Sequence, residues 1–287
     1  MSAPASPALD AAAVERGYDN RAAIPDHMAW FARWAQRSRE VRERCACVLD
    51  LRYGPNAKET LDLFVPQGPA RGTLLFVHGG YWRALDKADH SFVAAPFVAQ
   101  GIAVAVQNYD LCPGVTIAAI VDETRRALSW LVRDGPRHGA APSRIVVAGH
   151  SAGGHLAAMM MATPAAAFGV GGHPVHAAVS VSGVHDLRPL VLFSYNADFR
   201  LDAAEAARLS PALMPPATGA PLLVAVGGDE TSEFLRQARL QWDAWPANRP
   251  AGTDGPLVIP GRHHLAVVDD YADPASLLTR RTLQLFG

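Results

Sequence analysis

Gly149-His150-Ser151-Ala152-Gly153 is a G-x-S-x-G motif, and its surroundings predict a sharp turn between a strand and a helix. A short β-branched run at 144–148 precedes the motif, and a helix-forming run at 154–161 follows it. A serine on such a turn projects its hydroxyl above the sheet, and the flanking glycines tolerate the crowded backbone. The alternative is a glycine-rich turn whose serine only caps the helix. The setting favours a nucleophilic Ser151.

The composition is that of one large domain. The chain has 287 residues, 49% of them hydrophobic and 18% charged, enough to bury a core without disulfides or metals. A net charge of −1 indicates no nucleic-acid partner, and no stretch approaches the roughly 18 apolar residues that span a bilayer, so no membrane partner is expected. Cys45, Cys47 and Cys112 form neither a disulfide framework nor a zinc pattern, so we expect a cytoplasmic protein.

Strand and helix patterns alternate along most of the chain. Residues 1–17 are expected to be a disordered tail, and 18–287 a single domain that begins with a helical arm at 18–44. The irregular segment 187–201 is a candidate lid. The expected strands are 45–53, 60–65, 73–77, 102–106, 144–148, 178–181, 222–226 and 257–259, and the expected helices are 90–100, 118–133, 154–161, 202–208, 233–245 and 276–285. This order predicts an α/β fold with a mostly parallel sheet and helices on both faces.

Polar residues follow two of the later strands. A serine nucleophile needs a base, and the base needs an orienting carboxylate. Asp229 and Glu230 follow one strand, and either could orient an imidazole because they share a turn. His263 and His264 follow the last strand, and we favour His264 because the apolar segment after it can anchor it. The order serine, acid, histidine is that of an α/β-hydrolase.

A second glycine-containing loop, His78-Gly79-Gly80-Tyr81-Trp82, follows the strand at 73–77. Acyl transfer needs preorganised N–H donors for the oxyanion, and such donors come from the nucleophile turn and from this loop. We therefore predict an oxyanion hole built from the backbone of Gly79, Gly80 and Tyr81, together with that of Ala152.

The motifs together resemble the arylformamidase (kynurenine formamidase) branch of the α/β-hydrolases. The resemblance lies in the segments 78–82, 149–155 and 228–237, and it extends to 18–21 and 53–66, so it covers nearly the whole chain. The H-G-G-Y-W form is fairly specific, since related lipases and esterases usually carry a third glycine where Tyr81 stands. The resemblance implies Glu230 as the catalytic acid, although many relatives have Asp there, and His264 as the base.

The resemblance implies hydrolysis of N-formyl-L-kynurenine to kynurenine and formate through an acyl-enzyme. A short-chain carboxylesterase or amidase acting on small aryl or acyl esters is the alternative, because specificity depends on pocket shape. Trp82, His155 and Tyr195 are expected to line the substrate pocket, with a structural role equally open for His155. No cofactor and no metal is expected. The expected partner is a small-molecule substrate, and the resemblance is compatible with a homodimer.

Overall fold

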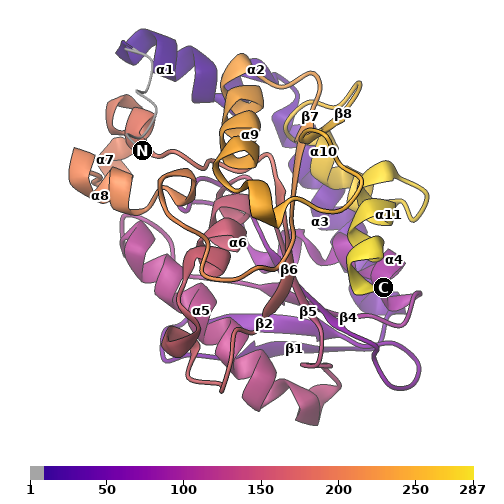
Figure 1. Ribbon diagram of the computed structural model, residues 1–287. Helices are drawn as coiled ribbons and strands as arrows, with labels where there is room; N and C mark the ends of the chain where they lie inside the picture. Colours follow the sequence, from indigo (N-terminus) through magenta and orange to yellow (C-terminus); the bar gives the residue numbers. More distant parts are fainter. Residues whose placement is uncertain (1–9) are drawn as a thin grey trace.

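The computed structural model describes residues 10–287, and an eight-stranded sheet forms its centre (Figure 1). The strand order is β1-β2-β4-β3-β5-β6-β7-β8. β1 pairs antiparallel with β2 and β2 with β4, whereas the pairs from β4 through β3 to β8 are parallel. The strands are β1 Cys47–Arg52, β2 Thr60–Phe64, β3 Thr73–Val77, β4 Ala103–Gln107, β5 Ile145–His150, β6 Val175–Val181, β7 Leu222–Gly227 and β8 Leu257–Ile259.

Helices cover both faces of this sheet (Figure 1). One core lies between the sheet and α5, α6 and α9, and the other between the opposite face and α3, α4, α10 and α11. The helices are α1 Ala11–Tyr18, α2 Asn20–Ala23, α3 His27–Arg44, α4 Ala94–Val98, α5 Ile117–Arg133, α6 Ala152–Ala162, α7 Asn196–Phe199, α8 Ala203–Arg208, α9 Ser232–Ala244, α10 Ala266–Asp269 and α11 Leu277–Leu283. The predicted fold class is confirmed.

The central strands are mostly apolar because both of their faces are buried. In β3, Leu75 and Val77 belong to the core under α5 and α6, while Leu74 and Phe76 belong to the core under α3 and α4. The carboxyl ends of β3, β5, β7 and β8 meet at one edge of the sheet. The loops that carry the predicted site residues follow these ends.

The beginning of the chain differs from its prediction. Residues 1–9 lie outside the described part, but 11–18 form α1, so a disordered tail through residue 17 is wrong. Asp10 caps the helix by accepting a hydrogen bond from Ala13 N at 2.7 Å, and Val14 and Tyr18 are fully buried. Figure 1 shows α1 beside α9, with which it is in contact. This segment is helical because its short apolar face is covered by α9.

The arm and the candidate lid both have regular structure. The arm at 18–44 contains α2 and α3, separated by a break at 24–26. The segment 187–201 contains the 3₁₀ turn Arg188–Leu192 and the helix α7. Phe193 and Phe199 of this segment are buried in the core under α5 and α6.

One glycine sets how closely α6 approaches β3. A Cβ on Gly153 would lie 1.9 Å from the carbonyl oxygen of Val77 and 2.8 Å from that of His78. Both contacts are with backbone atoms, which cannot move aside by a change of rotamer as a side chain can. Only a residue without a side chain therefore fits at this position of α6.

We predict that Gly153→Ala destabilises the fold, although helix propensity alone favours alanine by up to about 1 kcal/mol. Overpacking typically costs about 1–3 kcal/mol, which corresponds to a drop in Tm of several degrees for a domain of this size. Thermal unfolding of the variant measures the drop. Gly172→Ala is the matched control, since a Cβ there meets nothing within 4 Å. A Gly153→Ala protein that melts at or above the wild-type temperature would contradict this account.

Buried histidines make the fold sensitive to acid. Burial lowers the pKa of His78, His90 and His155 to about 4 and that of His185 to about 3. Burial and the nearby His264 lower the pKa of His150 as well. These imidazoles are neutral in the folded protein at pH 7, so protonation opposes folding.

We expect the free energy of unfolding to fall as the pH drops from 6.5 towards 4. Above pH 6.5 these histidines are neutral in both states, whereas below it the unfolded chain takes up protons that the folded chain excludes. Each histidine then costs about 1.4 kcal/mol per pH unit down to its folded pKa. Burial raises the pKa of Glu123 to about 7 and also raises the pKa values of Asp89 and Asp270, which acts in the opposite sense, but these three carboxyls are fewer than the five histidines. Urea unfolding at about pH 7, 6 and 5 measures the trend, and constant or rising stability would refute it.

Candidate active site

Ser151 occupies a strained turn between β5 and α6. Its φ of 55° and ψ of −116° lie outside the usual regions for a side-chain-bearing residue. Its N–H donates to Val181 O at 2.8 Å, which holds the turn in place. The backbone of Gly149 also packs so closely on Gly153 that a Cβ on Gly149 would lie 2.1 Å from Gly153 O. The strand, turn and helix therefore have the geometry of a nucleophile elbow, with Ser151 at the start of α6.

His264 and Glu230 meet at the carboxyl ends of β7 and β8. His264 Nδ1 lies 2.6 Å from Glu230 Oε2, and the side chains are 5% and 0% exposed. A carboxylate only accepts, so Nδ1 carries the proton and Nε2 presents its lone pair. Glu230 Oε1 accepts from Gly227 N at 2.8 Å and from the hydroxyl of Ser182. Phe234 packs 4.4 Å from the His264 ring, so the pair is held in one orientation.

The neighbouring acid and histidine lie elsewhere. Asp229 is exposed, and its N–H bonds to Arg262 O at 3.1 Å. The ring of His263 packs edge-on against Trp30 at 5.0 Å, and its Nδ1 accepts from Leu265 N at 3.2 Å. Of the two tandem pairs, Glu230 and His264 are the members that contact each other.

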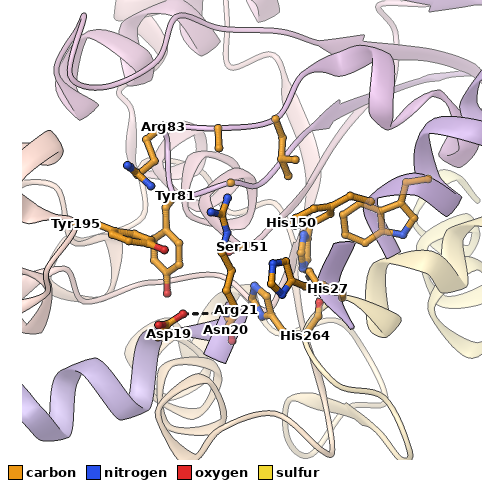
Figure 2. A pocket seen from close by; sticks show the side chains of 16 residues that line it. Asp19, Asn20, Arg21, His27, Tyr81, Arg83, His150, Ser151, Tyr195 and His264 are labelled. Atoms are coloured by element: carbon orange, nitrogen blue, oxygen red, sulfur yellow. Dashed lines mark hydrogen bonds between the residues drawn. The ribbon is translucent and has the colours of Figure 1, made fainter. Parts of the chain in front are cut away.

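Ser151 and His264 line one pocket, whose empty space, including the part open to solvent, is about 590 Å³ (Figure 2). Figure 2 shows Ser151 near the middle of the labelled side chains, with His150, His27 and His264 on one side and Tyr195, Tyr81 and Arg83 on the other. The remaining lining residues are Asp19, Asn20, Arg21, Phe31, Trp34, Gly80, Ala84, Leu85 and Leu265.

The loop after β3 lies directly against the nucleophile turn. A Cβ on Gly79 would lie 3.2 Å from Ser151 Cβ. Within residues 10–287, the N–H groups of Gly80, Tyr81 and Ala152 donate no hydrogen bond. These are donors that the sequence predicts for the oxyanion, and they flank Ser151.

Each of these N–H groups is aimed by the carbonyl of its own peptide. His78 Nδ1 donates to Gly79 O at 2.8 Å, which turns the N–H of Gly80 the opposite way. Gly80 O accepts from Arg83 N and Ala84 N, both at 3.0 Å, which fixes the peptide that carries the Tyr81 N–H. Ser151 O accepts from His155 N at 3.0 Å, which fixes the Ala152 N–H. The three donors are therefore preorganised.

Two predicted pocket residues lie in the core instead. Trp82 is fully buried, 5.0 Å from the His155 ring and 5.6 Å from Phe199. His155 is also fully buried, and its Nε2 donates to Leu209 O at 2.8 Å. Neither lines the pocket, so the pocket role predicted for Trp82 is wrong, and His155 has the structural role that the sequence left open. The Trp82 indole packs inward against aromatic neighbours. Tyr195 does line the pocket, 5.7 Å from the Tyr81 ring.

Sequence reasoning missed several residues of the site. Ser182 follows β6 at the same edge of the sheet, so the rule that placed Glu230 and His264 could have found it. Asp19, Asn20 and Arg21 come from α2 and its cap, and no periodic pattern reveals that this short helix reaches the pocket.

No group of three or more His, Cys, Asp or Glu side chains within residues 10–287 is placed to hold a metal ion. In the same part of the chain, no helix has the length and apolar character needed to cross a membrane.

The sheet order, the elbow and the covering helices define an α/β-hydrolase fold. The family described as BD-FAE matches residues 61–193. Kynurenine formamidase from Salmo salar is 27% identical over 92% of this chain and 89% of its own length. Carboxylesterase NlhH from Mycobacterium tuberculosis is 39% identical over 30% of this chain and 28% of its own.

A solved structure shows the likeness at the level of the fold over nearly the whole chain. A candidate thioesterase from a Silicibacter species is 34% identical, with a TM-score of 0.82 over 93% of this chain and 97% of that one. The chain belongs to the arylformamidase (kynurenine formamidase)-like branch of the α/β-hydrolase family, and it is a hydrolase.

We predict that Glu230→Gln lowers kcat at least about 100-fold, because an amide cannot stabilise the His264 cation and can present the wrong partner to Nδ1. Asp229→Asn, one residue away on the same turn, should stay within about twofold of wild type. Steady-state kinetics on any substrate that the wild type hydrolyses measures both. Equal losses in the two variants, or a larger loss in Asp229→Asn, would show that the contacting carboxylate is not the one that matters.

Proposed function

We propose that this hydrolase cleaves an aryl formamide, N-formyl-L-kynurenine, to kynurenine and formate, with Ser151 as nucleophile, His264 as base and Glu230 as orienting acid. The observation that carries the proposal is the 2.6 Å contact between His264 and Glu230 beside the strained Ser151 turn. Likeness to kynurenine formamidases along nearly the whole chain supports the choice of substrate.

In the first half-reaction, Ser151 Oγ attacks the formyl carbon and His264 Nε2 takes the hydroxyl proton. The carbonyl oxygen becomes an oxyanion, which the N–H groups of Gly80, Tyr81 and Ala152 stabilise. His264 then gives its proton to the aryl amine as the C–N bond breaks, which leaves a formyl ester on Ser151. Glu230 stabilises the imidazolium through both steps.

In the second half-reaction, water attacks the formyl ester and His264 takes a proton from it. The tetrahedral intermediate collapses, His264 returns the proton to Ser151 Oγ, and formate leaves. A formyl group bears only hydrogen on its carbonyl carbon, so it needs little room beside the oxyanion donors. Aromatic side chains among the lining residues, including Tyr81, Tyr195 and Phe31, suit an aryl leaving group.

An aryl or short-chain carboxylesterase is the second candidate. The same residues cleave an ester by the same steps, and the local likeness to a carboxylesterase favours it. An ester has a better leaving group than an amide, so activity on an activated ester alone does not separate the two.

We predict a higher kcat/KM for N-formyl-L-kynurenine than for phenyl acetate, and a loss of at least about 1,000-fold on both in Ser151→Ala. Labelling by a fluorophosphonate should occur in the wild type and disappear in the variant. A clear preference for phenyl acetate would favour the esterase. Retention of more than a tenth of the activity in folded Ser151→Ala would refute the mechanism.

A further inference from the structure

Arg21 places an unpaired, solvent-exposed cation on the wall of the active-site pocket. It belongs to α2 and lines the same pocket as Ser151 and His264 (Figure 2). Within residues 10–287, its guanidinium forms no ion pair within 4.0 Å and no hydrogen bond, not even with Asp19 two residues before it. A guanidinium offers five donors in a planar fork and stays charged at every relevant pH.

The other charged groups of the pocket wall are already engaged. Arg83 Nε donates to Asp198 Oδ2 at 2.5 Å, and its guanidinium stacks 4.3 Å over the Tyr195 ring. Asp19 Oδ1 accepts from Arg21 N at 3.0 Å and from Ala22 N at 3.1 Å. The cap fixes the backbone of α2 and leaves the Arg21 side chain as the unneutralised positive group of the pocket.

Asn20, next to Arg21, supplies an independent sign of a missing ligand. Asn20 is only 8% exposed and lines the pocket, and its buried Nδ2 has no hydrogen-bond partner. Neither end of its amide bonds to any other part of residues 10–287. Rotation of the amide by half a turn presents either the NH₂ or the oxygen to the pocket. A buried amide left in this state costs stability unless a ligand completes it.

We infer that Arg21, with Asn20 beside it, binds a carboxylate on the part of the substrate that leaves with the amine, so that the enzyme selects acylated aryl substrates of the amino-acid class. The inference rests on the proposed function for the position of the scissile bond at Ser151. A carboxylate matches the paired donors of a guanidinium, and the amide NH₂ of Asn20 supplies a further donor. The carboxylate of Asp19 lies in the same wall, where it suits the ammonium of an α-amino acid. It also disfavours a substrate that carries a second carboxylate.

The position of Arg21 depends on contacts that tie the end of α1, which leads directly into α2, to the predicted catalytic loops. Tyr81 OH donates to Tyr18 O at 2.6 Å, and Thr231 Oγ1 donates to Gly17 O at 2.6 Å. One contact comes from the oxyanion loop and the other from the residue after Glu230. A carboxylate held by Arg21 is therefore held at a fixed place relative to the groups around the scissile bond.

The test compares matched substrates that differ only in this charge. One pair is N-formyl-L-kynurenine and its α-carboxamide, and the other is O-acetyl-L-tyrosine and O-acetyl-L-tyrosinamide. For the wild type we expect kcat/KM to favour each carboxylate over its amide. In Arg21→Gln that preference should fall about 10- to 50-fold, through KM rather than kcat, and Arg21→Lys should restore part of it. Arg16→Gln, an exposed arginine on α1 outside the pocket, should keep the wild-type preference.

An unchanged preference in Arg21→Gln overturns the inference, as does an equal loss of preference in Arg16→Gln, which would indicate a general effect of charge. A wild type that cleaves only the esters refutes the formamidase proposal, while the ester pair still tests Arg21. The two ideas therefore fail separately.

Discussion

The close backbone approach of α6 to β3 is the constraint on which the site depends. At Gly153 the helix meets the carbonyl of Val77, the last residue of β3, with no room for a Cβ. This contact brings the turn at Ser151 against the loop that begins at His78, so that donors from both segments flank one serine. A helix held further away would leave the Ala152 N–H too distant to act together with the N–H groups of Gly80 and Tyr81.

The acid–base pair depends on satisfying a buried carboxylate. Glu230 is fully buried at its side chain, and burial of an unpaired charge is costly. Its two oxygens together accept from Gly227 N, the Ser182 hydroxyl and His264 Nδ1. Ser182 follows β6 and His264 follows β8, the two strands beside β7, so the carboxylate also ties those two loops to the end of its own strand. The same contacts set the tautomer of His264, with the lone pair of Nε2 left for the pocket.

Sequence reasoning identified the sheet and the loops at its carboxyl edge, because both have local signals. Apolar β-branched runs mark the buried strands, and glycines or polar pairs follow where a loop must bend or react. It could not choose between Asp229 and Glu230 from spacing, since adjacent residues on a turn differ only in the direction of their side chains. Resemblance indicated Glu230, and Glu230 is the acid that contacts His264 in the structure.

The predictions for Trp82 and for residues 11–17 were wrong because their conformation depends on contacts with residues far away in the sequence. Trp82 lies at the end of the predicted oxyanion loop, but its indole packs against His155 and Phe199 in the core. Its backbone has a φ of 54°, which the sequence does not reveal. The sequence predicts a tail at residues 11–17 because a single turn of apolar residues is too weak a pattern to predict a helix. Their helix exists through Val14 and Tyr18, which bury against elements more than 150 residues away, such as Gln237. No local window contains that partner.

In the proposed mechanism, the N-terminal segment links substrate recognition to catalysis. Gln237 Nε2 donates to Tyr18 OH at 2.7 Å, and a Cβ on Gly17 would lie 2.5 Å from Glu233 Cγ, so α1 is pressed against α9. The carbonyl of Tyr18 in turn holds Tyr81, whose own N–H faces the reacting oxygen in the proposed mechanism. Any shift of α1 would therefore move an oxyanion donor and the Arg21 side chain together. In the proposal, Arg21 contributes binding energy and keeps the bound substrate in place relative to that donor, which agrees with an effect on KM.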